Sequence, residues 1–344
     1  MLKNFKSITL GAAAVVASLV AGPVSAQTTL NLSSWLPPSH PIVANMIVPW
    51  AEEVEKATNG NVTVRILPKP LGKPPAHFDI AKDGLADITY GVHGYQPGRF
   101  ALTKAVELPF LGDSATATSV AYWRIYQKHF EAVGEHRGVK VLGLFTHGPG
   151  NIFNSARPVE QLSDLDGLKI RVGGGVVNDV AKAIGATALL KPAPESYELM
   201  AAGVADGVFF PQESIKSFRL TDLVKYGTIV PGGLYNTSFF LVMNPRSFDN
   251  LSAADQEAIM SVSGEHFAKI AGKGWDDADA AGNAAMMEAG VTLIQASDAM
   301  VTEIKAKTAE IEQAWIEEAN AKGLDGAAIM AELRAEIAAA SGSN

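Results

Sequence analysis

The sequence contains no cysteine, and this absence removes several classes of protein at once. Without a thiol there can be no disulfide bond, no cysteine-ligated metal and no cysteine nucleophile. The fold must therefore rest on the burial of apolar side chains. A chain of 344 residues is long enough to build two lobes of ordinary domain size in this way.

The common enzyme motifs are also absent. There is no G-x-S-x-G turn and no H-E-x-x-H helix, and the seven histidines form no recognisable triad or metal spacing. Gly173-Gly174-Gly175 lies between a predicted strand and a predicted helix, but Asn178 stands where a dinucleotide-binding motif has its third glycine. We therefore expect no catalysis, no cofactor and no metal site, with a secreted hydrolase as an alternative.

Positive charge is scarce as well. The formal net charge of −8 becomes −10 when the two lysines of the N-terminal segment, Lys3 and Lys6, are removed. Nucleic-acid binding needs clustered Lys and Arg side chains that neutralise phosphates, so we expect no nucleic-acid partner. A single arginine can still bind a small anion, because it acts at contact distance.

The longest apolar stretch of the sequence lies at the N-terminus. Lys3 and Lys6 precede an apolar run over residues 8–20, and the segment closes with the small residues Val24-Ser25-Ala26. This order is typical of a secretory signal peptide. A membrane anchor is the alternative, but a spanning helix needs about 20 apolar residues. We predict cleavage after Ala26 and export to the periplasm.

After this segment, predicted strands and helices alternate, which favours an α/β architecture with largely parallel strand pairing. A first set of elements precedes residue 148 and a second set follows it. The third section is helical. One helical pattern runs without a clear break over residues 252–288, which is longer than an ordinary globular helix of about 8–20 residues. Such a helix often bridges two lobes.

Several short motifs, in this order and spacing, resemble the solute-binding subunits of TRAP transporters, the dicarboxylate-binding class. The most specific motif is Asp166-Gly167-Leu168-Lys169-Ile170-Arg171-Val172 with its small-residue turn. The others are Glu52-Glu53-Val54, Thr58-Asn59-Gly60-Asn61-Val62, Gly84-Leu85-Ala86-Asp87-Ile88, Glu107-Leu108-Pro109-Phe110-Leu111, Ala205-Asp206-Gly207 with Pro211, and Leu251-Ser252-Ala253-Ala254-Asp255-Gln256.

The resemblance implies a two-lobed fold whose interlobe cleft closes on a ligand, with a long helix spanning both lobes. We expect residues 27–148 plus 237–276 in one lobe and residues 149–236 plus 277–344 in the other. The ligand would be a small organic acid, delivered to a TRAP permease made of a large and a small membrane subunit. We expect a monomer, and a periplasmic sensor or adaptor of the same fold is the alternative function.

Arg171 is the first candidate for ligand binding. It ends a predicted strand beside three glycines, and the carboxylate-clamping arginine of the family falls on this position. A planar guanidinium can hold a carboxylate with two parallel hydrogen bonds. The structural alternative is a strand-end arginine paired with Asp164 or Asp166.

Two departures from the family change the expected ligand. Asn151 occupies the position where many members carry a second arginine, and Phe210 occupies the position of a polar asparagine. One charge and an aromatic wall favour a monocarboxylate with an apolar or aromatic part over a dicarboxylate. Because adjacent strand residues face opposite ways, Phe210 and not Phe209 is expected to face the cleft.

The remaining candidates are polar or aromatic side chains in loops that follow predicted strands, where ligands bind in open α/β sheets. Each has a structural alternative, namely packing on a lobe surface or a satisfied loop histidine. The candidates are Trp35, His93 and Tyr95 from the first lobe, Gln212 with Glu213 after Phe210, and Asn236, which lies with Tyr235 and Phe239 where the chain recrosses between lobes.

Overall fold

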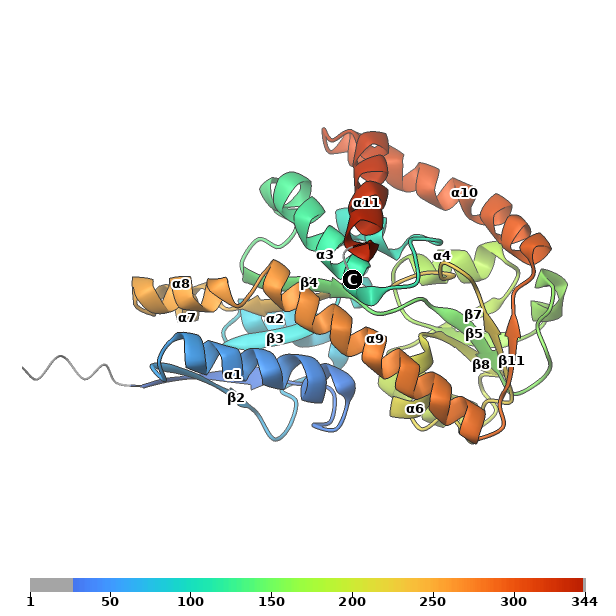
Figure 1. Ribbon diagram of the computed structural model, residues 1–344, viewed down its shortest axis with the longest axis horizontal. Coiled ribbons are helices and arrows are strands. Elements are labelled where there is room, and N and C mark those ends of the chain that lie inside the picture. The colour runs from blue at the N-terminus through green and yellow to red at the C-terminus, as the bar shows by residue number, and fades with distance from the viewer. Residues whose placement is uncertain (1–26, 343–344) are drawn as a thin grey trace, which may run out of the picture.

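The computed structural model describes residues 27–342, so the predicted signal peptide, residues 1–26, lies outside the described residues. The chain forms two lobes, each built on its own β-sheet with helices packed around it (Figure 1). This confirms the predicted two-lobed α/β fold. Within residues 27–342, no helix has both the length and the apolar character needed to cross a membrane.

The first lobe contains a five-stranded sheet in the order β2-β1-β3-β10-β4. β1 pairs in parallel with β2 and β3, whereas β10 runs antiparallel to both β3 and β4. The strand that enters from the second half of the sequence therefore lies inside the sheet of the first half. Its strands are β1 (Thr28–Ser33), β2 (Val62–Ile66), β3 (Ile88–Val92), β4 (Lys140–Thr146) and β10 (Ser238–Met243).

The second lobe contains a six-stranded sheet in the order β11-β9-β5-β8-β6-β7. β5 is its antiparallel member, pairing with β8 on one side and β9 on the other. The strands are β5 (Asn151–Asn154), β6 (Lys169–Val172), β7 (Thr187–Leu190), β8 (Gly207–Phe210), β9 (Tyr226–Ile229) and β11 (Thr292–Gln295).

Eleven α-helices occur within residues 27–342. Short 3-10 or π-type turns extend several of them. The helices are α1 (Val48–Ala57), α2 (His77–Lys82), α3 (Ala115–Ile125), α4 (Val176–Ala183), α5 (Ser196–Ala201), α6 (Gln212–Ser217), α7 (Pro245–Asp249), α8 (Ala253–Ser261), α9 (Glu265–Glu288), α10 (Asp298–Ala321) and α11 (Gly326–Ser341).

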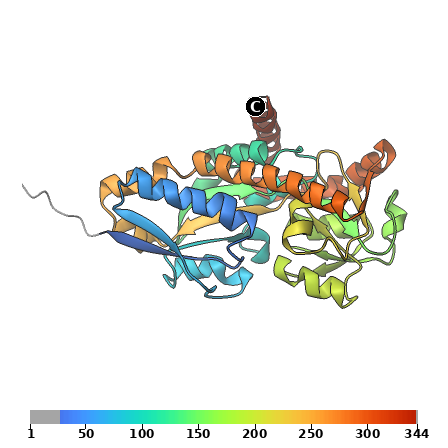
Figure 2. The same ribbon diagram turned by 60° about the horizontal axis from the view of Figure 1, so that its bottom comes forward.

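Three segments of the described chain connect the two sheets. Residues 147–150 lead from β4 to β5, and residues 230–237 lead from β9 back to β10. The third is α9, which packs on α3 and β4 of the first lobe and on α6 of the second. Figure 2 shows α9 lying along one face of both lobes. Two extended crossings beside one helix form a natural hinge.

The predicted long helix is confirmed as an interlobe bridge, but its continuity is wrong. The helical pattern over 252–288 is divided into α8 and α9, with a break that ends at Gly264. Gly264 has a φ of 61°, and a Cβ there would come within 2.8 Å of the Trp123 side chain. The break therefore follows from close packing against a bulky ring, which helical periodicity does not reveal.

The C-terminal helices cross back over the molecule. α10 contacts α4 of the second lobe, whereas α11 packs against α3 beside the first sheet. Residues 326–341, which the sequence places with the second lobe, thus lie against the first (Figure 1). The exact boundaries between the lobes stay a prediction.

α9 lies so close to α3 that its glycines are required at the contact. A Cβ on Gly272 would come within 2.3 Å of the Thr116 Cα atom. We predict that Gly272→Ala lowers the free energy of unfolding by about 1–2 kcal/mol, because overpacking outweighs the gain in helix propensity. Urea unfolding measures this change.

Gly342→Ala is the matched control, since a Cβ there would be 3.8 Å from its nearest neighbour. It should change the stability by less than about 0.5 kcal/mol. Equal effects of the two substitutions would contradict the close helix contact.

Candidate ligand-binding site

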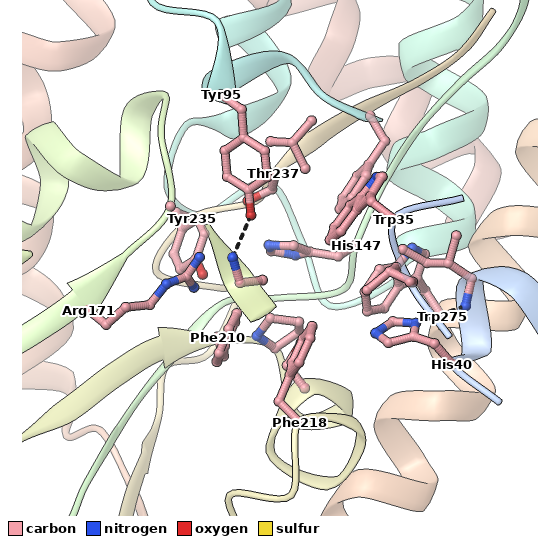
Figure 3. Close-up of a pocket in the computed structure, with 18 residues that line it drawn as sticks. Trp35, His40, Tyr95, His147, Arg171, Phe210, Phe218, Tyr235, Thr237 and Trp275 are labelled. Atoms are coloured by element: carbon pink, nitrogen blue, oxygen red, sulfur yellow. Dashed lines mark hydrogen bonds between the residues drawn. The ribbon is translucent and has the colours of Figure 1, made fainter. Parts of the chain in front are cut away.

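A pocket lies between the two lobes beside their crossing segments. About 450 Å³ of space not filled by protein atoms lies in the pocket and its open mouth together. Most of its lining is apolar or aromatic (Figure 3). The lining residues are Trp35, Leu36, His40, Ile42, Val92, Tyr95, His147, Arg171, Gly173, Ala193, Phe210, Pro211, Ser214, Phe218, Tyr235, Thr237, Phe239 and Trp275.

Arg171 supplies the charge of this pocket. It stands on β6 and is only 2 % exposed. Its Nε and Nη2 atoms donate to the Lys191 carbonyl oxygen at 2.9 and 2.7 Å. Within residues 27–342, Arg171 forms no salt bridge with a carboxylate. Asp164, one of the two partners considered for it, instead accepts from the Glu160 and Gln161 amides. The predicted structural alternative for Arg171 is therefore wrong.

The guanidinium stays charged although it is out of water. Burial lowers the pKa of Arg171, while the phenol groups of Tyr95 and Tyr235 act in the opposite direction. An arginine does not lose its proton under these conditions. Two of its five N–H bonds point at the Lys191 carbonyl, so the Nη1–Nη2 edge remains for an anion. The site is therefore a preformed place for one negative charge.

Two stacked rings, Phe210 and Phe218, form an aromatic wall next to the Arg171 guanidinium. Phe210 lies at the end of β8 with its ring 4.5 Å from the Arg171 Cζ atom, and Phe218 stacks on Phe210 at 5.5 Å. Phe209 faces the opposite way and is fully buried in the core, as strand alternation requires. A flat apolar group bound next to the guanidinium would thus lie against aromatic rings.

Tyr95 joins the two lobes across the pocket. It follows β3 in the first lobe, and its hydroxyl oxygen accepts from the Ala193 amide of the second lobe at 2.9 Å (Figure 3). The Tyr95 phenol also lies close enough to the Arg171 guanidinium to act on its pKa. Because the phenol oxygen accepts from Ala193, its hydrogen is left to donate to an anion held by Arg171.

Further contacts hold the lobes together below the pocket. Glu107 of the first lobe accepts from the Val176 amide at the start of α4 at 2.9 Å and from the Ser238 amide at 3.2 Å. A Cβ on Gly174 would come within 1.7 Å of the Gly94 carbonyl oxygen, and one on Gly175 would strike the Glu107 carboxylate. These two glycines therefore make room for the opposite lobe, and Gly173 alone lines the pocket.

A buried pair of His40 and Glu213 lies at the end of the pocket away from Arg171. His40 of the first lobe and Glu213 of the second approach within 3.5 Å between Nε2 and Oε1, without a hydrogen bond. Burial lowers the pKa of His40 to about 3 and raises the pKa of Glu213 to about 7. Burial also raises the pKa of Asp279, which accepts from the Glu213 amide at 2.7 Å. At neutral pH the histidine is uncharged, so we treat this contact as a polar pair and not as a salt bridge.

The structure brings four of the eight predicted ligand-binding residues together in the pocket: Arg171, Phe210, Trp35 and Tyr95. Trp35 packs edge-on to Tyr95 with ring centroids 6.2 Å apart. Each of these four comes from the end of a strand or the loop that follows it, in agreement with the rule used to select them. Their contact with a ligand stays a prediction.

The other four predicted residues do not line this pocket. His93 is buried with its Nε2 atom 2.8 Å from Nε2 of His136, among aromatic rings of the first lobe. The Asn151 side chain bonds to backbone on both sides, donating to the Pro149 carbonyl and accepting from the Val230 amide. It therefore ties the two strand crossings together.

Gln212 and Asn236 are displaced by one position from the pocket wall. Gln212 begins α6, and its neighbours Pro211 and Ser214 line the pocket instead. Asn236 is buried, and its amide donates to the Glu107 carbonyl, while Tyr235 and Thr237 on either side line the pocket. Asn236 lies in an extended segment, where successive side chains point to opposite faces. An error of one residue therefore selects the face that points away from the pocket.

Several polar or aromatic pocket residues lay outside the predicted set of ligand-binding residues. They are His40, His147, Ser214, Phe218, Tyr235, Thr237, Phe239 and Trp275. The two crossings can be recognised in the sequence from the order of the strands. All residues of these crossings could therefore have been proposed together as candidates for ligand binding. Trp275 carried no such signal, because an apolar residue on a helix is ordinarily read as core.

Comparison with known proteins identifies the family. Residues 32–318 match the model of bacterial extracellular solute-binding protein family 7, named DctP. The chain belongs to this family. The family resemblance drawn from the short motifs is thereby confirmed.

Relatives agree with this assignment over almost the whole chain. The outer membrane transporter protein TsaT of Comamonas testosteroni is 32 % identical over 95 % of this chain and 97 % of its own. A TRAP periplasmic solute-binding protein of Bordetella bronchiseptica, solved with (R)- and (S)-mandelate, is 49 % identical with a TM-score of 0.88, covering 90 % of this chain and 98 % of its own. A marine metagenome TRAP protein specific for aromatic acids, in complex with 3-hydroxybenzoate, is 34 % identical with a TM-score of 0.85, covering 91 % and 99 %.

The family assignment decides between the interpretations left open by the sequence. The protein is a TRAP-type solute-binding protein, and this interpretation is favoured over a sensor or a secreted hydrolase. The family is a periplasmic, solute-binding component of transport.

The buried Glu213 carboxyl should make stability depend on pH in a specific direction. Its pKa is raised from 4.5 to about 7, so the folded state binds more protons than the unfolded state between these values. The stability from this group is full below pH 4.5 and is lost as pH rises through 7. Relative to wild type, Glu213→Gln should therefore gain about 1–3 kcal/mol of unfolding free energy between pH 5 and pH 8.

Urea unfolding of both proteins at the two pH values measures this gain. The contribution of His40, whose pKa shift has the opposite sign, is present in both proteins. The charge of Glu213 contributes to the raised pKa of Asp279, so its removal shifts the Asp279 contribution in the same direction as the expected gain. Glu198→Gln, at an exposed position of the same lobe, should show a difference from wild type that is nearly constant with pH. A constant difference for Glu213→Gln as well would refute the buried, raised carboxyl.

Proposed function

We propose that this protein captures a small aromatic monocarboxylate between its lobes and delivers it to a TRAP permease. The observation that carries the proposal is the pairing of one buried cation without a carboxylate partner, Arg171, with an aromatic wall that begins at Phe210. The ligand carboxylate neutralises the guanidinium, and the ligand ring lies along the wall.

The charge of the pocket supports a monoanion. Arg171 is the one Lys or Arg side chain in the lining, whereas the lining histidines His40 and His147 have pKa values lowered by burial to about 3 and about 4. Both are neutral near pH 7. A second ligand carboxylate would be buried without a cation, at a cost of several kcal/mol.

The shape and surface of the pocket support an aromatic group. Phe210, Phe218 and Trp35 present ring faces or edges to the space beside Arg171 (Figure 3). Burying apolar ligand surface there contributes roughly 25 cal/mol per Å². The Bordetella relative, with its bound mandelate, and the metagenome relative, with its bound 3-hydroxybenzoate, support the same ligand class for this chain.

Export and delivery complete the proposal. Residues 1–26 direct the chain to the periplasm and are then removed. The two lobes close over the ligand by rotation about the crossings and α9, and the closed protein presents the ligand to the membrane subunits. The Tyr95 to Ala193 hydrogen bond, which spans the lobes beside Arg171, is a contact formed only on closure.

Substitution of Arg171 tests the anion site. Arg171→Gln keeps a hydrogen-bond donor but removes the charge, so its affinity for benzoate should fall by about 2 kcal/mol or more, roughly 30-fold. Isothermal titration calorimetry measures the affinity. Arg157→Gln is the control, because Arg157 bonds to backbone carbonyls away from the pocket. Unchanged affinity of Arg171→Gln would rule out the clamp.

A panel of acids tests the ligand class independently of any substitution. Benzoate and phenylacetate should raise the melting temperature of the wild-type protein, whereas succinate and malate should give little or no shift at equal concentration. The buried charge of the second carboxylate is the physical reason for the difference. A panel in which the dicarboxylates gave the largest shifts would overturn the proposed ligand.

A further inference from the structure

The pocket contains a hydrogen-bond acceptor that a carboxylate cannot satisfy. His147 directly follows β4, in the first crossing between the lobes, and is 4 % exposed while lining the pocket. Its ring packs edge-on against Tyr235 and Trp275, with centroids 5.3 and 5.7 Å apart. Figure 3 shows this ring between Arg171 and Trp275.

The position of the proton on His147 follows from its neighbours. The Nδ1 atom bonds to the Gly148 carbonyl oxygen, and a carbonyl oxygen can only accept. The proton of the neutral ring therefore lies on Nδ1. Burial holds the pKa of His147 at about 4, so a second proton is absent at neutral pH. The Nε2 atom is then a bare acceptor.

This Nε2 atom makes no hydrogen bond within residues 27–342, although the rest of the ring is fixed by Gly148 and the aromatic contacts. A carboxylate has acceptor atoms only and would be repelled by it. What the atom requires is a donor. Figure 3 shows the His147 ring on the Arg171 side of the pocket, so the ligand group nearest to it is one close to the carboxylate held by Arg171.

We infer that His147 selects aromatic acids with a hydroxyl on the carbon next to the carboxylate, by accepting a hydrogen bond from that hydroxyl at Nε2. The inference rests on the proposed function and names a narrower class of ligand, the 2-hydroxy-2-aryl acids. Arg171 then binds the carboxylate and the aromatic wall binds the ring. His147 accepts a hydrogen bond from the hydroxyl on the carbon between them. A hydroxyl is the smallest group that meets this requirement.

The test compares two ligands that differ only in this hydroxyl, mandelate and phenylacetate. Calorimetric titration of the wild-type protein should give an affinity for mandelate about 10-fold higher than for phenylacetate. In His147→Phe, which keeps an aromatic ring but has no acceptor, mandelate should bind about as weakly as phenylacetate. The readout is the ratio of the two affinities, which should fall to about one in His147→Phe, so that a general change of the pocket in this variant cancels.

His147→Gln provides a rescue, because its amide oxygen is an acceptor and should restore part of the preference for mandelate. The wild-type comparison stands even if a variant does not fold. Equal wild-type affinities for the two ligands, or a preference that survives in His147→Phe, would overturn the inference and leave the proposed function intact. A wild-type protein that binds neither acid would instead refute the proposed function.

A third ligand separates the two ends of the pocket. 3-Hydroxyphenylacetate places its hydroxyl on the ring, toward the end where His40 lies in Figure 3, opposite Arg171. His147→Phe should not change its affinity relative to phenylacetate. If His147→Phe lost as much affinity for 3-hydroxyphenylacetate as for mandelate, His147 would accept from ring hydroxyls as well. That result would contradict the inference.

Discussion

The structure depends on one constraint, the burial of the positively charged Arg171 guanidinium. In the described part of the chain this group has no carboxylate partner. Arg171 is 2 % exposed, and its hydrogen bonds within the chain go to neutral oxygens. A buried charge of this kind is costly until an anion joins it. The ligand therefore completes the electrostatics of the closed protein, which links capture directly to closure. The aromatic side chains and the neutral histidines around Arg171 carry no charge. One negative charge on the ligand is therefore enough to neutralise the pocket.

The rest of the structure brings the two lobes to this cation. Tyr95 reaches Ala193 across the pocket, Glu107 caps the first turn of α4, and His40 meets Glu213 at the far end. All three contacts join side chains of the first lobe to the second. Two of these contacts involve buried carboxyl groups, those of Glu107 and Glu213, whose pKa values are raised by burial.

The sequence predicted the fold class, most strands and the cation of the site, because each leaves a local pattern. Arg171 and Phe210 were found from the family resemblance, with strand ends and strand alternation as support. Asn151 and His93 have the right chemistry, yet tertiary hydrogen bonds with Val230 and His136 occupy them. The break before α9 and the role of Trp275 depend on contacts between distant segments, for which a single sequence carries no signal.

The central claim is that the ligand carboxylate neutralises Arg171 inside the interlobe pocket. A crystal structure of the protein with bound benzoate tests this most directly. The account predicts the two carboxylate oxygens within about 3.2 Å of the Arg171 Nη1 and Nη2 atoms, with the ring against Phe210. A benzoate whose carboxylate lay at any other cation, with Arg171 still bonded only within the chain, would contradict it.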